Sequence, residues 1–200
     1  MWSQILIFSS IVAAGIFDVK ERAVSDFIWL PAGIGLVYTL LTRSDLFFSI
    51  AVKIGFIGLI AVGFTVYGAI GQADAIALIF LASDPYFISP LIIFVGAAFT
   101  ALAHISYIYL SGKGNPRLVT IEKFKKEQNW IPRAIINPEG RVEVSRDVNK
   151  AREEVLENAK EGTMVEVTYG VPTIAYLAAG YAVYLAYLVL FNYGIFLNLP

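Results

Sequence analysis

The sequence contains no cysteine among its 200 residues. This absence excludes disulfide bonds, thiol catalysis and zinc sites built on cysteine, and it leaves the cellular compartment open. Charge is also scarce, since Asp, Glu, Lys and Arg make up 16% of the chain, against about 25% in a typical soluble domain. The formal net charge of −1 and the lack of a glycine-rich phosphate loop give no sign of nucleic-acid or nucleotide binding.

Long apolar runs occupy most of the remaining sequence, which is 58% hydrophobic. A membrane helix needs about 20 apolar residues, and five runs satisfy or approach this length: 2–17, 27–42, 46–70, 90–110 and 170–198. Residues 71–82 would extend only about 18 Å as a helix, which is less than the hydrocarbon core of about 30 Å, so we predict a short sixth span there. The N-terminal run lacks the basic segment of a cleavable signal and is interpreted as a retained first span.

The charged residues are concentrated between the fifth and the last apolar run, at 111–168. Two short apolar segments around the turn residues 137–140 predict a β-hairpin, residues 147–160 have the spacing of an amphipathic helix, and residues 164–168 favour another strand. The predicted fold is therefore an all-α polytopic membrane protein of about six transmembrane helices, with a small cytoplasmic α+β insert before the last helix. Its expected parts are a membrane domain at 1–110, the insert at 111–168, and a last helix at 169–200 that packs with the membrane domain.

The distribution of positive charge predicts the orientation in the membrane. With six spans, loops 18–26, 71–74 and 111–168 share one side, and they contain most of the 15 lysines and arginines. The opposite side has Arg43, together with Lys53 if that side chain reaches the surface. Positively charged loops stay in the cytoplasm. We therefore expect a multi-pass protein of the cell membrane, with the insert and the chain around Asp18 and Asp74 on the cytoplasmic side.

Asp18 and Asp74 are the most informative residues, because each lies at the end of a long apolar run. A carboxylate in hydrocarbon costs roughly 2.5–3.5 kcal/mol on insertion scales, so such residues usually have a function. When two carboxylates face each other, one keeps a proton while the other stays charged. The charged member can draw a proton from water that attacks a carbonyl group, and the protonated member can hydrogen-bond the carbonyl oxygen.

The sequence around these aspartates resembles that of type IV prepilin peptidases. Asp18-Val19-Lys20-Glu21-Arg22-Ala23-Val24-Ser25-Asp26 is similar to the family's Asp-x-Lys/Arg-x-Arg-x-Ile-Pro-Asn/Asp signature. Gly71-Gln72-Ala73-Asp74 is similar to its Gly-x-Gly-Asp motif, which presenilin-like intramembrane proteases share. Residues 169–175, with Pro172, look like the proline-containing segment before the last span. The cysteine-free insert is similar to that of the archaeal preflagellin and prepilin peptidase branch of these aspartyl proteases.

The resemblance implies an endopeptidase that removes the short basic leader from archaellin and type IV pilin-like precursors, without methyltransferase activity. It implies that Asp18 and Asp74 are catalytic, and that neither a metal nor an organic cofactor is needed. The other motif residues would support the site: Lys20, Arg22, Asp26, Gly71, Gln72, Ala73 and Pro172. Two residues depart from the family pattern, since Ala73 replaces the second motif glycine and Ser25 replaces the usual proline.

Other interpretations of the same residues remain open. Asp18 and Asp74 could simply cap helices, and Lys20 and Arg22 could be cytoplasmic anchors. A small ion- or proton-coupled transporter or channel with paired carboxylates is the principal alternative, and a scaffold subunit without chemistry is a third. The expected partners are the precursor substrate and the lipid bilayer, with no nucleic acid, and the oligomeric state is left open.

Three kinds of residue have simpler expected roles. His104, a single histidine inside a span, is a poor metal site. Asp84 is expected to be an ordinary loop residue. Five glycines are expected to permit close helix packing: Gly33, Gly35, Gly55, Gly58 and Gly63.

Overall fold

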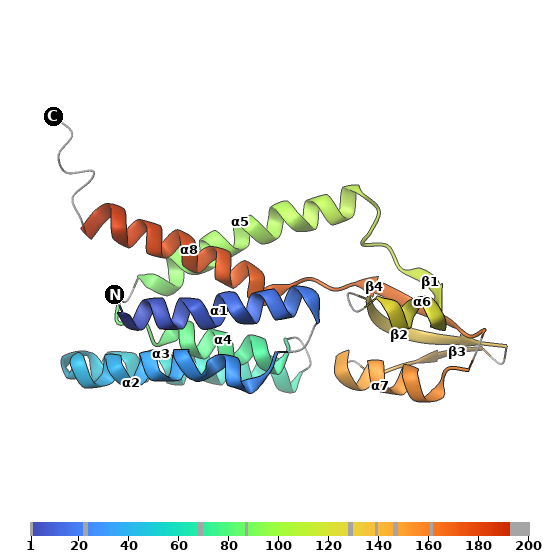
Figure 1. The fold of residues 1–200 in the computed structure, drawn as a ribbon, viewed down its shortest axis with the longest axis horizontal. Helices are drawn as coiled ribbons and strands as arrows, with labels where there is room; N and C mark the ends of the chain where they lie inside the picture. Colours follow the sequence, from blue (N-terminus) through green and yellow to red (C-terminus); the bar gives the residue numbers. More distant parts are fainter. Residues whose placement is uncertain are drawn as a thin grey trace. The chain divides into compact units, whose positions relative to one another are not determined.

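The fold is mostly helical, with one small antiparallel sheet (Figure 1). The computed structural model describes residues 2–21, 24–67, 70–86, 88–127, 130–138, 140–145, 148–160 and 162–192. The chain divides into two compact units. The helical unit comprises Met1–Asp18, Ala23–Leu102 and Pro172–Pro200, and the sheet unit comprises Val19–Arg22 and Ala103–Val171.

In the helical unit, helices that follow one another in the chain run in opposite directions (Figure 1). This unit contains α2 (Leu30–Thr42), α3 (Phe47–Val66), α4 (Gln72–Ala82) and α8 (Thr173–Asn192), with 3-10 turns η1 (Asp26–Trp29) and η2 (Ser44–Leu46) on either side of α2. It also contains α1 (Trp2–Lys20) as far as Asp18 and α5 (Ser89–Leu110) as far as Leu102. Because successive helices reverse direction, the C-terminal end of α1 and the N-terminal ends of α2, α4 and α8 lie at the same end of this unit (Figure 1).

Four helical segments of the described chain are long and apolar enough to cross a membrane: Trp2–Lys20, Ser44–Val66, Ser89–Leu110 and Thr173–Phe191. These four correspond to predicted spans, so the length and composition of the helices agree with the predicted membrane protein. Helix α4 is short, as the sequence indicated, with 11 residues. The second predicted span is also short, because the chain enters it through η1 and α2 has only 13 residues, with Pro31 in its first turn. Residues 193–198 of the last predicted span lie outside the described residues.

The helical unit has a compact core surrounded by apolar surface. Buried residues of α1, α2, α4, α5 and α8 form a single cluster, in which Tyr181 and Tyr184 are the largest fully buried side chains. Large apolar side chains such as Phe48, Leu59 and Leu102 are largely exposed. Helices with this much outward-facing apolar surface are expected in lipid, where such side chains are well solvated.

Close helix crossings depend mostly on glycines other than those expected. A Cβ on Gly180 of α8 would lie 2.1 Å from the carbonyl oxygen of Ile93 in α5, and a Cβ on Gly35 would lie 2.8 Å from the carbonyl oxygen of Ser3. Gly35 is therefore a packing glycine, as predicted. The same prediction is wrong for three others, since a Cβ would have nothing within 4 Å at Gly33, Gly55 or Gly63.

The sheet unit contains four strands in the order β1-β4-β2-β3, all antiparallel to their neighbours. Their bounds are β1 (Arg117–Thr120), β2 (Trp130–Asn137), β3 (Gly140–Glu143) and β4 (Met164–Tyr169), with helices α6 (Ile121–Lys126) and α7 (Val148–Asn158). The predicted hairpin is present as β2 and β3, which pair from Ala134 with Glu143 to Asn137 with Gly140. Gly140 has a φ of 138°, a conformation that favours glycine.

The remaining predictions for this segment are partly confirmed. The predicted amphipathic helix is α7, which buries Ala151 and Val155, and the predicted third strand is β4. The sequence did not predict β1 or α6. Phe124 of α6 is fully buried in the core of this unit, together with residues of β1, β2, α7 and β4, so these two short elements complete the fold.

Candidate active site

Asp18 is held at the junction of α1 and α8. Its half-buried side chain lies two residues before the end of α1, and its Oδ2 atom accepts a hydrogen bond of 3.2 Å from the backbone amide of Ile174. That amide belongs to the first turn of α8, whose N–H groups have no partner within the helix. One turn earlier in α1, a Cβ on Gly15 would lie 3.1 Å from the Cα of Ala175. The small residue at this position lets the two helices approach closely enough for the hydrogen bond.

Asp74 lies in the first turn of α4 and caps the helix that contains it. Its Oδ2 atom accepts a hydrogen bond of 3.0 Å from the backbone amide of Gly71, which is the N-cap residue. The side chain is half-buried. One oxygen of this carboxylate therefore caps α4, which confirms the prediction that Asp74 could act as a helix cap. The same hydrogen bond fixes the orientation of the side chain.

The two aspartates belong to the same end of the helical unit. The C-terminal end of α1 and the N-terminal end of α4 lie there together with the beginning of α8 (Figure 1), and all three helices contribute to one core cluster. The Asp18–Ile174 hydrogen bond joins the first motif to the proline-containing segment, because Ile174 follows Pro172 by two residues.

The other predicted motif residues are distributed around these helix ends. Lys20 is exposed at the end of α1, and Arg22 lies outside the described residues. Gln72 is exposed at the beginning of α4. Pro172 is buried immediately before α8, and its carbonyl oxygen accepts a hydrogen bond of 3.4 Å from the amide of Tyr176.

Ala73 fits its position without strain. It is the second residue of α4, where helical backbone angles suit any L-residue. Gly71 itself has a φ of −74°, which also does not require glycine. The departure from the Gly-x-Gly-Asp pattern at residue 73 is therefore compatible with the backbone of this turn.

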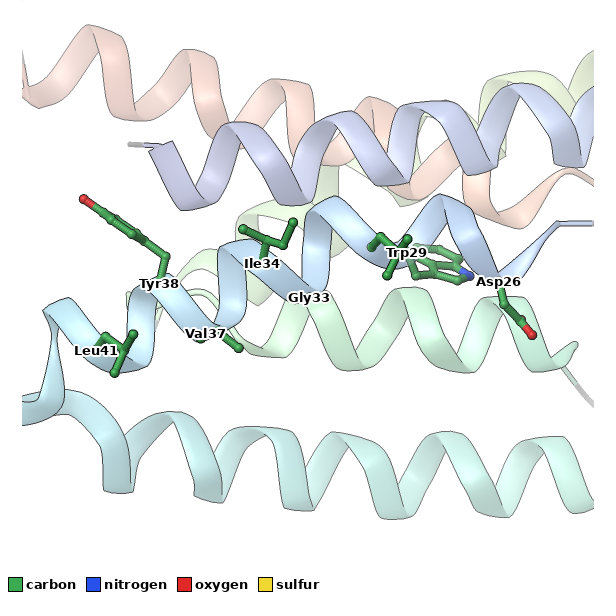
Figure 2. Close-up of a pocket in the computed structure, with 8 residues that line it drawn as sticks. Asp26, Trp29, Gly33, Ile34, Val37, Tyr38 and Leu41 are labelled. Atoms are coloured by element: carbon green, nitrogen blue, oxygen red, sulfur yellow. The ribbon is translucent and has the colours of Figure 1, made fainter.

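Asp26 lies at one end of an apolar groove. The groove has a volume of about 620 Å³ and follows η1 and α2 as far as Leu41. Figure 2 shows Trp29, Ile34 and Val37 along its length, with Asp26 at the end where η1 begins. Asp26 is exposed, and it is the only acidic residue among the groove's lining side chains.

A third acidic residue, Asp84, was wrongly expected to be an ordinary loop residue. It is fully buried just after α4 and hydrogen-bonds Gln4 of α1 and Tyr184 of α8. Lys53, which was counted with the non-cytoplasmic charges only if its side chain reached the surface, is 9% exposed and donates to backbone carbonyl groups of the same loop. The predicted topology contained a signal that was not used, since it puts the beginning of the first span, with Gln4, on the same side of the membrane as the loop that contains Asp84.

Comparisons with protein-family models, with curated proteins and with solved structures found no match for this chain. Among the residues that the structure describes, no three His, Cys, Asp or Glu side chains are grouped so as to hold a metal ion. His104 instead packs against the aromatic rings of Tyr107 and Tyr169, at centroid distances of 6.5 and 6.4 Å.

Proposed function

We propose that this protein is a membrane aspartyl endopeptidase. It would remove the short basic leader from archaellin or type IV pilin-like precursors at the cytoplasmic face, with Asp18 and Asp74 as the catalytic pair. The observation that carries the proposal is the shared location of the two motif aspartates. They belong to separate helices whose ends lie at the same end of the helical unit, and each accepts a backbone hydrogen bond.

The proposed chemistry needs one ionised and one protonated carboxyl group. The ionised group takes a proton from a water molecule, whose oxygen adds to the carbonyl carbon of the scissile peptide bond. The protonated group hydrogen-bonds the carbonyl oxygen and stabilises its developing charge. The proton taken from water then passes to the leaving nitrogen as the C–N bond breaks, which gives a carboxyl and an amine product.

The backbone contacts support these roles. The backbone amides of Gly71 and Ile174 donate to Oδ2 of Asp74 and of Asp18 respectively, so each carboxyl group is oriented by the backbone. Oriented groups lose less entropy on reaching the geometry of the transition state. The Asp18 contact also couples the site to the beginning of α8, which would explain why the motif before the last span contains a proline that fixes the backbone.

The expected result is loss of cleavage when either catalytic carboxyl group is removed. Purified protein in detergent would be given an archaellin or pilin precursor, and Asp18→Asn and Asp74→Asn would be compared with wild type. Because acid–base catalysis contributes about 10²–10⁴-fold, we expect each variant to reduce kcat by about that factor. Asp45→Asn is the matched control, since Asp45 is exposed in η2 and pairs with Arg43 at 3.4 Å. Equal cleavage by all four proteins would refute the proposed pair.

Asp84 favours a transporter as the second candidate function. A proton or ion relay needs acidic groups at several membrane depths, and Asp84 provides a buried carboxylate at the other end of α4 from Asp74. Its carboxylate accepts three hydrogen bonds, however, so a proton or ion would have to displace well-placed donors. Proton or cation uptake into liposomes that depends on Asp84, without cleavage of any precursor, would favour the transporter.

A further inference from the structure

A buried polar network lies at the opposite end of α4 from Asp74. The carboxylate of Asp84 accepts hydrogen bonds from Tyr184 Oη at 2.8 Å, from the amide of Tyr86 at 3.0 Å and from Gln4 Nε2 at 3.1 Å. Gln4 Nε2 also donates to Tyr184 Oη at 3.3 Å. Asp84 and Tyr184 are fully buried and Gln4 is 3% exposed. The network therefore has no direct access to solvent and depends on its internal partners.

Lys53 adds a third helix to this network. Its ammonium group donates to the backbone carbonyl oxygens of Asp84 and Tyr86. Both carbonyl groups lie in the loop between α4 and α5, where the Tyr86 carbonyl oxygen also accepts hydrogen bonds from the amide and hydroxyl groups of Ser89. The loop after α4 is thus joined by side chains to α1, α3 and α8, all within the helical unit.

Helix α4 needs these polar anchors because it is too short for its length to determine its depth in the bilayer. Eleven residues extend about 16 Å, and the hydrocarbon core is about 30 Å thick. Matching between an apolar helix and the bilayer normally limits how far a longer helix can slide. Apolar contacts between helices in lipid gain little from the hydrophobic effect, so polar contacts and close packing determine their relative positions.

The helices that bind Asp84 are also those that position Asp18. Helix α1 carries Gln4 near its beginning and Asp18 near its end, and α8 carries Ile174 and Tyr184. These two helices are therefore connected twice, once through Asp18 and the amide of Ile174, and once through the Asp84 network. Helix α4 has Asp74 in its first turn and Asp84 just beyond its last residue.

From this arrangement we infer that Asp84 is a positioning residue. Asp84 fixes the position of α4 along its axis relative to α1 and α8. Although it lies at the opposite end of the helical unit, it thereby sets the distance between Asp18 and Asp74. The consequence for cleavage rests on the proposed function. The effect of Asp84 on the axial register of α4 is independent of the proposed function, because it follows from the contacts of Asp84.

Tyr181 provides a matched control for Tyr184. It lies one turn earlier in α8, it is also fully buried, and its ring packs edge-on against Tyr184 at a centroid distance of 5.6 Å. Within the described residues its hydroxyl group has no hydrogen-bond partner. Tyr181→Phe and Tyr184→Phe thus each remove one buried hydroxyl group from α8, but only the second removes a hydrogen bond to Asp84.

The register can be measured directly because the chain lacks cysteine. Spin labels on Ile16→Cys in α1 and Gln72→Cys in α4, both at exposed positions, report the distance between the helix ends that carry the aspartates. We expect Tyr184→Phe to shift the mean distance by about 1.5 Å, the rise of one helical residue, or to broaden the distribution by as much. Tyr181→Phe should leave the distribution unchanged.

An unchanged distribution in folded Tyr184→Phe would overturn the inference, as would an equal change in Tyr181→Phe. Folding is checked by helical circular dichroism and elution as a single species. If Tyr184→Phe does not fold, Gln4→Leu replaces it, since this change removes the amide contacts but leaves the tyrosine ring in place. For Gln4→Leu too, an unchanged distance distribution, or an equal change in Tyr181→Phe, would overturn the inference.

Cleavage by the unlabelled variants supplies a second readout. Misplacement of reacting groups by 1 Å can cost about 10²-fold in rate, so Tyr184→Phe should lower kcat strongly while KM stays near the wild-type value. A role in stability alone would lower the melting temperature and leave kcat unchanged well below it. If wild type does not cut the precursor, the proposed function fails, and the spin-label distances still test the register.

Discussion

At the scale of single residues, capping and catalysis are compatible roles for Asp74. The hydrogen bond to Gly71 uses one carboxylate oxygen, and a carboxylate has about four acceptor positions. Asp18 behaves similarly, since one of its carboxylate oxygens accepts a hydrogen bond from a backbone amide in the first turn of α8. A single residue can therefore stabilise a helix end and still present a carboxyl group for chemistry.

Ala73→Gly is expected to be tolerated. Position 73 is helical, so glycine gains nothing from its freedom at positive φ and should cost at most about 1 kcal/mol of helix stability. Precursor cleavage at wild-type kcat, with a slightly lower melting temperature, is the expected result. Complete loss of folded protein would mean that this turn depends on the alanine side chain.

At the level of helices, the crossing of α5 and α8 is tightly constrained by two glycines. Gly180 faces the backbone of Ile93 and Ala97, and a Cβ on Gly96 would lie 3.0 Å from the Cα of Gly180. Two glycines at one crossing bring the helix backbones together, as small residues commonly do in membrane proteins. Any added side chain at Gly180 has to push the helices apart.

Gly180→Ala should therefore destabilise the protein, by about 1–3 kcal/mol as is typical for overpacking. The new Cβ would lie 2.7 Å from the amide nitrogen of Ala97, in addition to its contact with Ile93. Gly63→Ala in α3 is the matched control, because nothing lies within 4 Å of its Cβ position and alanine favours a helix. Thermal unfolding in detergent would compare them, and a wild-type melting temperature for Gly180→Ala would contradict the packing argument.

At the scale of the whole molecule, the distribution of charge predicts sidedness. The sheet unit contains basic residues of α6 such as Lys123, Lys125 and Lys126, whereas the turn between α2 and α3 has Arg43 paired with Asp45. Loops rich in lysine and arginine remain in the cytoplasm. We therefore expect the sheet unit and the α2–α3 turn on opposite sides of the membrane.

Labelling of single cysteines would test this orientation. Lys125→Cys and Ser44→Cys are both at exposed positions, and the cysteine-free wild type is the control for background labelling. In intact cells, a maleimide that cannot cross membranes should label Ser44→Cys, and it should label Lys125→Cys only after the cells are opened. Labelling of Lys125→Cys from outside would reverse the predicted orientation.

Features that depend on local pattern could be predicted from the sequence. Apolar runs predicted five long spans, of which four are long helices, together with the short α4, and turn residues around Pro138 predicted the hairpin of β2 and β3. These features could be predicted because burial and turn chemistry are encoded over a few residues. The tertiary structure alone decided which polar residues meet. Gln4, Asp84 and Tyr184 are far apart in the chain and come together only when α1 and α8 pack around the end of α4. Gly180 likewise became a packing residue because α5 crosses it, and no local pattern specifies that contact.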